Sequence, residues 1–161
     1  MGNLFSQFKT VKVGKGKTLH LNRQQIFDAL KEQLKFDNTT KVIINDRDYI
    51  ALDRDVFRGF AEKDGTDKLK YKSERSDCDD FTRVFLGNVA KNVFKHGSSG
   101  DKGLAVGEIQ GTLYKDGTPV NHSMVVVITN QGGKPKVELF EPQNDKFYSI
   151  DSRNVYWSVH V

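Results

Sequence analysis

The sequence contains a single cysteine, Cys78, among its 161 residues. One cysteine cannot form an internal disulfide or a thiolate zinc cluster, which excludes a disulfide-stapled scaffold and a zinc-finger fold. A lone cysteine is most often a small buried hydrophobe. The alternative is a reactive nucleophile, which requires a histidine and a third polar residue elsewhere in the chain.

Long apolar runs are also missing. The longest run, Met124–Ile128, has the length of a strand and falls far short of the roughly 20 residues that cross a bilayer. Residues 1–20 contain no apolar stretch followed by a small-residue cleavage site, so we expect no secretion signal and predict a cytoplasmic protein. This lysine- and glycine-rich stretch is predicted to form a flexible N-terminal segment.

Charge of one sign is only slightly in excess. Lysine and arginine total 25 and aspartate and glutamate total 21, which gives a net charge of +4. The acidic residues are spread among the basic ones, whereas nucleic-acid binding needs basic residues gathered on one face. The sequence therefore argues against a nucleic-acid partner. The 11 phenylalanines and 5 tyrosines supply core material for one domain spanning residues 1–161.

The hydrophobic pattern predicts helices first and strands afterwards. Apolar residues at helical spacing predict a helix over 22–36, a short one after Asp53, and the clearest one over 79–94. A short strand is expected at 41–45, and from Leu104 onward the pattern changes to strands separated by turn signals. We therefore predict an α+β fold in which N-terminal helices pack on a C-terminal antiparallel sheet.

Cys78 stands at the start of the clearest predicted helix. The backbone N–H groups of a first helical turn lack intrahelical partners, and the helix dipole is positive there. Both effects favour a thiolate, which is the reactive form of cysteine. The same N–H groups are suited to holding an oxyanion.

Two further polar residues follow in the order that a cysteine nucleophile needs. His122 opens an apolar strand 122 − 78 = 44 residues after the cysteine, and Glu141 ends the next strand 141 − 122 = 19 residues later. A histidine can carry the proton, and a carboxylate can orient the imidazole. Gln143 follows shortly after and is a candidate to support the histidine or to line the site.

Four sequence blocks carry a resemblance to a known family. They are SDCDDF at 76–81, GEIQG at 107–111, HSMVV at 122–126 and LFEPQ at 139–143. Together they resemble the papain-like C-terminal domain of fungal ricin-type agglutinins and its stand-alone bacterial and phage relatives. The resemblance covers roughly 46–143 and implies a papain-like cysteine protease with a peptide or protein substrate. It assigns the catalytic triad to Cys78, His122 and Glu141.

The resemblance also implies a dependence on calcium. Asp79 and Asp80 match acidic positions of the family's nucleophile block and are candidate metal ligands. Two carboxylates there oppose a thiolate at Cys78, and a bound cation would relieve that conflict. Acidic residues in a first helical turn also stabilise a helix without any metal.

Two alternatives remain open at this point. Bacterial cell-wall endopeptidases or amidases also place Asp-Cys-x-x-Phe at a helix start, although they usually have Ser-Gly where this chain has Asp79-Asp80. The other alternative is a catalytically silent binding or structural module. The sequence does not determine the oligomeric state.

Overall fold

The computed structural model describes residues 18–72, 77–96 and 102–161. The elements in chain order are β1 (Thr18–Asn22), α1 (Arg23–Leu34), β2 (Lys41–Ile43), β3 (Asp48–Leu52), α2 (Arg54–Asp64), a 3-10 turn (Thr66–Lys68), α3 (Cys78–His96), β4 (Gly103–Leu104), β5 (Val106–Lys115), β6 (Thr118–Gln131), β7 (Lys134–Glu141), β8 (Lys146–Tyr148) and β9 (Val155–His160). Most of the predicted flexible segment 1–20 lies outside the described residues.

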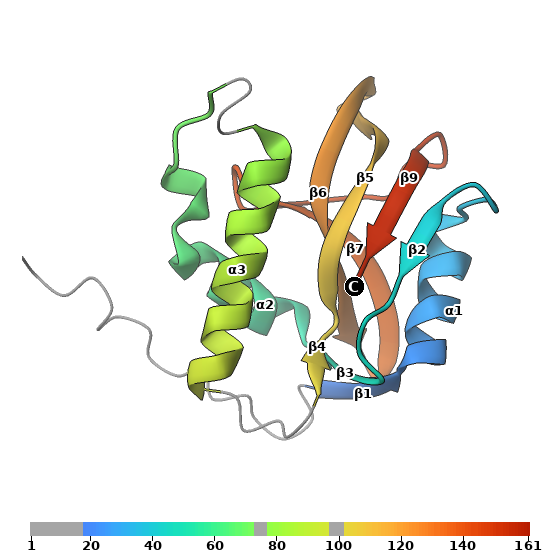
Figure 1. The fold of residues 1–161 in the computed structure, drawn as a ribbon, viewed down its shortest axis with the longest axis vertical. Helices are drawn as coiled ribbons and strands as arrows, with labels where there is room; N and C mark the ends of the chain where they lie inside the picture. The colour runs from blue at the N-terminus through green and yellow to red at the C-terminus, as the bar shows by residue number, and fades with distance from the viewer. Residues whose placement is uncertain (1–17, 73–76, 97–101) are drawn as a thin grey trace, which may run out of the picture.

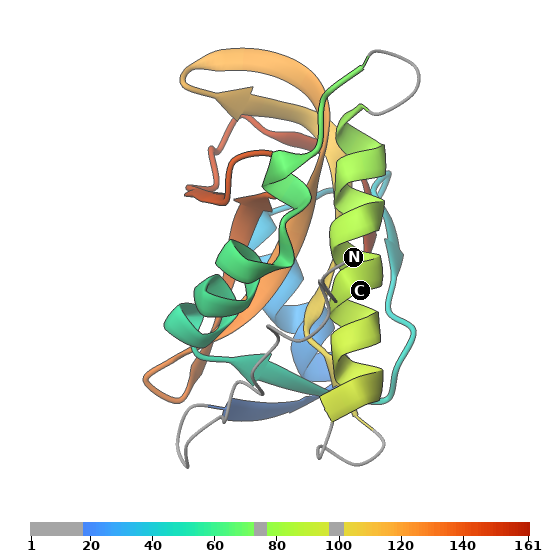
Figure 2. The same cartoon turned by 90° about the vertical axis from the view of Figure 1, so that its left-hand side faces the viewer.

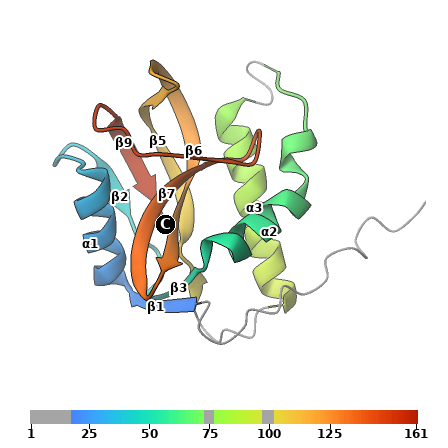
Figure 3. The same cartoon turned by 180° about the vertical axis from the view of Figure 1, so that it is seen from behind.

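The strands form two sheets. The larger one has six strands in the order β2-β9-β5-β6-β7-β8, and its neighbours are antiparallel except for the parallel pair β2 and β9. The smaller one has the order β1-β3-β4, with β3 and β4 parallel. Figure 1 shows α1 on one side of the large sheet and α2 and α3 on the other, and Figure 3 shows the same arrangement from behind.

Strand alternation along β6 divides the core between the two faces of the large sheet. Met124 and Val126 belong to the apolar cluster that includes α1, whereas Val125 and Val127 belong to the cluster that includes α2 and α3. Phenylalanine rings fill the second cluster, with Phe140 in edge contact with Phe57. Figure 2 looks onto this side, with α2 and α3 in front of the sheet.

The helix ends follow from local chemistry. Asn22 caps α1 in a capping box, because its side chain accepts from the backbone N–H of Gln25, whose side chain accepts in turn from the N–H of Asn22. Asp53 caps α2, and Gly65 ends that helix in the left-handed conformation that glycine adopts without steric cost. The helix predicted over 79–94 is present as α3.

The predicted helices-first layout is wrong. β1 precedes every helix, and β2 and β3 lie between α1 and α2, so strands and helices are interleaved. The large sheet is mixed because β2 joins its edge in parallel with β9, and strands outweigh the three helices in the described residues. The missed strands β1 and β3 are short and depend on pairing with each other, which local sequence does not reveal.

No helix within the described residues has the length and apolar character needed to span a membrane.

Candidate functional site

Cys78 is the first residue of α3 and is half-buried. Its sulfur accepts the backbone N–H of Ser123, which follows His122 on β6. The carbonyl of Cys78 accepts from Oγ1 of Thr82 at 3.0 Å, which is the side-chain bond that a threonine makes one turn along a helix. The packing of α3 on β6 therefore brings the cysteine next to the strand that carries the predicted histidine.

The environment of the thiol favours its protonated form. Burial raises the pKa of Cys78, the N–H of Ser123 opposes this effect, and the charges of Asp77 and Asp79 raise the pKa further. The position of Cys78 at a helix N-terminus alone predicts a lowered pKa for its thiol. In this protein, burial and the charges of two neighbouring carboxylates act against the thiolate that a helix N-terminus favours.

His122 and Glu141 are in direct contact. Nε2 of the His122 ring lies 2.5 Å from Oε2 of Glu141, and the side chain of Glu141 is 0% exposed. Lys115 donates to the same oxygen at 2.7 Å, and its Nζ lies 3.4 Å from Nε2 of His122. Burial raises the pKa of Glu141, but the hydrogen bonds from His122 and Lys115 outweigh it and hold the pKa below its usual range.

Gln143 contributes through its backbone. Its N–H donates to Oε1 of Glu141 at 3.3 Å, the oxygen that Lys115 and His122 leave free. Gln143 therefore lies beside Glu141, and the recorded contact is made by its backbone and not by its side-chain amide.

The structure brings together two of the three predicted site residues. His122 and Glu141 form a pair, and Cys78 contacts the neighbouring backbone. Within residues 18–72, 77–96 and 102–161, the recorded polar contacts of the His122 ring are with Glu141 and Lys115, and no hydrogen bond joins the ring to Cys78.

Lys115 was missed by sequence reasoning. It lies on β5, directly before the Asp116-Gly117 turn, and pairs with Thr118 on β6. In the same hairpin register Gly111 lies opposite His122, and Lys115 shares the face of Gly111 because the two are four residues apart on one strand. The Asp116-Gly117 turn signal predicts this hairpin, and its register could have identified Lys115 as a neighbour of His122.

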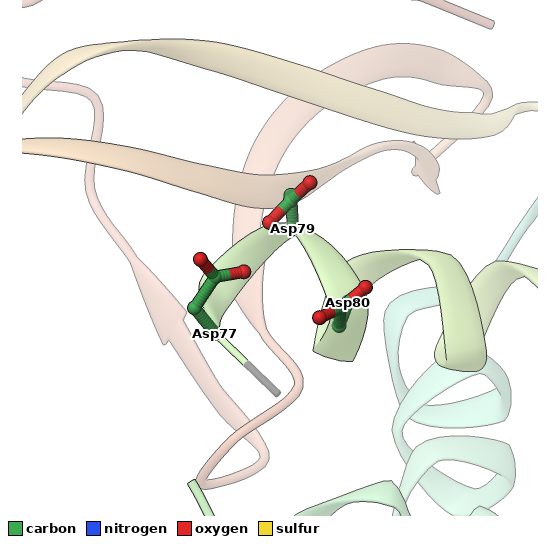
Figure 4. Close-up of side chains that lie close together, drawn as sticks. All are labelled: Asp77, Asp79 and Asp80. Carbon is green, nitrogen blue, oxygen red and sulfur yellow. The ribbon is translucent and has the colours of Figure 1, made fainter. Parts of the chain in front are cut away.

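Asp77, Asp79 and Asp80 gather at the N-terminal end of α3 (Figure 4), and one oxygen of each lies within 4.8 Å of the others. Oδ1 of Asp77 is inaccessible to solvent and has no hydrogen-bond partner among the described residues. A hydrogen bond between the two carboxyl groups raises the pKa of Asp77 and lowers the pKa of Asp79. Arg83 forms an ion pair with Asp79 at 2.5 Å.

Comparison with known proteins finds solved structures of the same fold, among them the following two. One is described as the PSL1a-E64 complex, with a TM-score of 0.73 and 23% identity over 87% of this chain and 50% of that chain. The other is Polyporus squamosus lectin bound to the human-type influenza-binding epitope Neu5Acα2-6Galβ1-4GlcNAc, with a TM-score of 0.69 and 24% identity over 87% of this chain and 49% of that chain. No protein-family model matches the chain, and no curated protein matches it in sequence.

These structures correct the family assignment made from the sequence. They are described as a lectin and its complexes, so the assignment to a papain-like cysteine protease domain, the predicted hydrolysis of peptide or amide bonds and the predicted peptide or protein substrate are not retained. The chain spans about half the length of both lectin structures, and at this identity the likeness shows the fold that the chain shares with them.

Proposed function

We propose that the chain is a ligand-binding module and that its ligand site lies at the N-terminal end of α3, beside the His122–Glu141 pair. The observation that carries this proposal is the fold shared with a lectin structure that holds a glycan epitope and with a complex that holds E64. The chain spans only about half of each of those proteins. We therefore do not assign the lectin's ligand to this chain, and the experiment below uses that ligand as a probe.

The chemistry of this end of α3 suits a polar ligand. It offers a half-buried thiol at Cys78, the backbone N–H groups of a first helical turn, and an imidazole whose Nδ1 has no hydrogen bond within the described residues. The His122 ring is 10% exposed, and its orientation is fixed by Glu141. A few convergent polar groups held rigidly by a sheet and a helix are typical of small-ligand sites.

The proposal is tested by calorimetry with two probes, the sialylated trisaccharide Neu5Acα2-6Galβ1-4GlcNAc and E64. We expect the parent protein to bind one of them, and His122→Gln to weaken that binding at least about tenfold, equivalent to about 1.4 kcal/mol. His160→Gln is the matched control, because His160 lies on β9 and contacts Asn45 instead.

Three results would contradict the proposal. The first is that neither probe binds. The second is that the parent, His122→Gln and Cys78→Ala bind a probe equally well. The third is a permanent adduct on Cys78 in intact-mass measurements, because reversible ligand binding does not produce one. The identity of the probe that binds then distinguishes glycan recognition from recognition of another polar ligand.

We further propose that the Asp77–Asp79–Asp80 cluster binds calcium. Calcium takes carboxylate oxygens at 2.3–2.6 Å, and the three aspartates supply oxygens close enough to meet around one ion. The buried and unpartnered Oδ1 of Asp77 fits a site that a cation would complete.

Thermal unfolding tests the calcium proposal. Calcium is expected to raise Tm more than magnesium does, because magnesium demands stricter octahedral geometry, and Asp79→Asn is expected to abolish the increase. Asp55→Asn, in the first turn of α2, is the control and should keep it. An equal response to calcium in the parent and in Asp79→Asn would exclude this cluster.

A further inference from the structure

Three polar side chains from three adjacent strands meet at one buried oxygen. Oε2 of Glu141 on β7 accepts from Lys115 on β5 and from His122 on β6. The exposed fractions of the three side chains are 0% for Glu141, 10% for His122 and 25% for Lys115. The lysine therefore reaches the carboxylate from the solvent side, and its Nζ also lies 5.4 Å from the centre of the Tyr148 ring.

The proton positions follow from which groups can donate. A lysine ammonium has no acceptor, and an ionised carboxylate has no donor. The contact between Nε2 of His122 and Glu141 therefore requires a proton on Nε2, because Lys115 leaves the carboxylate ionised. A neutral His122 ring then carries its lone pair on Nδ1, the nitrogen that faces away from Glu141.

The balance of charge decides whether that ring stays neutral. Glu141 supplies one negative charge, and Lys115 already supplies one positive charge 2.7 Å away. A doubly protonated His122 would place a second positive charge 3.4 Å from the ammonium in a largely buried setting, where like charges repel strongly. The other titratable group that the recorded contacts place beside this network is Tyr148 on β8.

We propose that Lys115 is a positioning residue that holds His122 as the neutral tautomer with its proton on Nε2 and its lone pair on Nδ1. The lysine does this by neutralising Glu141, so that the carboxylate orients the ring without drawing a second proton onto it. This inference deepens the proposed function by identifying Nδ1 as the hydrogen-bond acceptor that a ligand would meet. It rests on the proposed function in that respect alone.

Nitrogen-15 NMR of the histidine rings tests the inference directly, because ring nitrogen shifts report the tautomer. In the parent at neutral pH we expect a protonated Nε2 and a bare Nδ1 for His122. In Lys115→Met the ring faces a carboxylate that no lysine neutralises, and we expect the Nδ1 signal to move toward that of a protonated nitrogen. Lys115→Arg keeps the positive charge and should restore the parent signature.

Lys102→Met is the matched control. Nζ of Lys102 lies 2.8 Å from Nδ1 of His20, a lysine–histidine contact in which no carboxylate participates. This variant should alter the His20 signals and leave His122 unchanged. Amide spectra of each variant verify folding, and Lys115→Gln serves as the second variant if Lys115→Met does not fold.

The inference is overturned if His122 shows the same tautomer and the same pH response in the parent and in the uncharged Lys115 variants. Its failure is distinguishable from failure of the proposed function. A changed His122 signature with no binding of either probe would leave the role of Lys115 standing and reject the ligand site. Binding of a probe together with an unchanged His122 signature would support the ligand site and reject the role of Lys115.

Discussion

The imidazole of His122 and the carboxylate of Glu141 lie 2.5 Å apart, between neighbouring antiparallel strands, and the carboxylate has no exposed surface. An ionised carboxylate at such depth is stable only when hydrogen-bonded cations or donors compensate for its lost hydration. His122, Lys115 and the N–H of Gln143 provide that compensation.

Glu141→Gln should therefore destabilise the fold. The amide retains the shape of the side chain but leaves Lys115 without its counter-charge, so we expect a loss of about 3 kcal/mol in the free energy of unfolding. Urea unfolding at neutral pH measures it. Glu62→Gln, an exposed change on α2, should stay within about 0.5 kcal/mol of the parent. Equal stability of Glu141→Gln and the parent would show that the contact carries no net energy.

The same pair predicts how stability depends on acidity. Glu141 has a pKa below its ordinary value of 4.5 in the folded protein, so its ionised form stabilises the fold above the unfolded-state value. This contribution is lost as the pH falls through the lowered folded-state pKa. The stability difference between the parent and Glu141→Gln should shrink below about pH 4.5, as measured by urea unfolding across pH. A difference that grows in acid would contradict this.

Cys78 should react slowly with alkylating agents. Burial and the charges of Asp77 and Asp79 raise the pKa of its thiol, so little thiolate exists near neutral pH. With divalent cations removed, iodoacetamide should modify the parent more slowly than a free cysteine peptide, and Asp79→Asn should react faster than the parent. Modification of the parent faster than the peptide would show an activated thiol.

Asp145 is expected to limit stability. Burial and the nearby charges of Asp67, Asp64 and Glu62 raise its pKa to about 6. Because the folded state holds this proton longer than the unfolded state does, stability falls as the pH rises from about 4 to about 6. Asp145→Asn should therefore raise stability above pH 6 by about 1 kcal/mol, once screening at this partly exposed group is allowed for.

Asp116→Asn is the control for that change. Asp116 and Asp145 have similar left-handed backbone angles, with φ of 50° and 54°, which asparagine adopts readily. Asp116 is exposed, so its replacement should leave thermal stability unchanged at pH 7. Equal effects of the two substitutions would show a backbone rather than an electrostatic origin.

Two glycines should respond oppositely to alanine. A Cβ at Gly107 on β5 would collide with the carbonyl oxygen of His160 on the paired strand β9, so Gly107→Ala should cost at least about 2 kcal/mol. A Cβ at Gly87 within α3 meets nothing within 4 Å, and Gly87→Ala should stabilise the helix by about 0.5–1 kcal/mol. Thermal unfolding of both variants measures the contrast.

Local sequence determined the helices and the end of β7 at Glu141, whereas the expected strand start at His122 was wrong, because β6 begins at Thr118. The capping residue Asn22 and the apolar spacing around Phe81 and Phe85 identify α1 and α3, because capping and helical periodicity depend only on nearby residues. The same local patterns placed Cys78 at a helix start, His122 at the beginning of an apolar run and Glu141 at a strand end.

Only the tertiary structure decided how these pieces combine. The pairing of β1 with β3, the parallel pairing of β2 with β9 and the contact of Lys115 with Glu141 join residues far apart in the chain, so no local pattern reveals them. The direction of the Cys78 pKa depends on burial and neighbouring charges, which exist only after packing. The sequence determined which chemical groups are present and in what order, and long-range packing determined their surroundings.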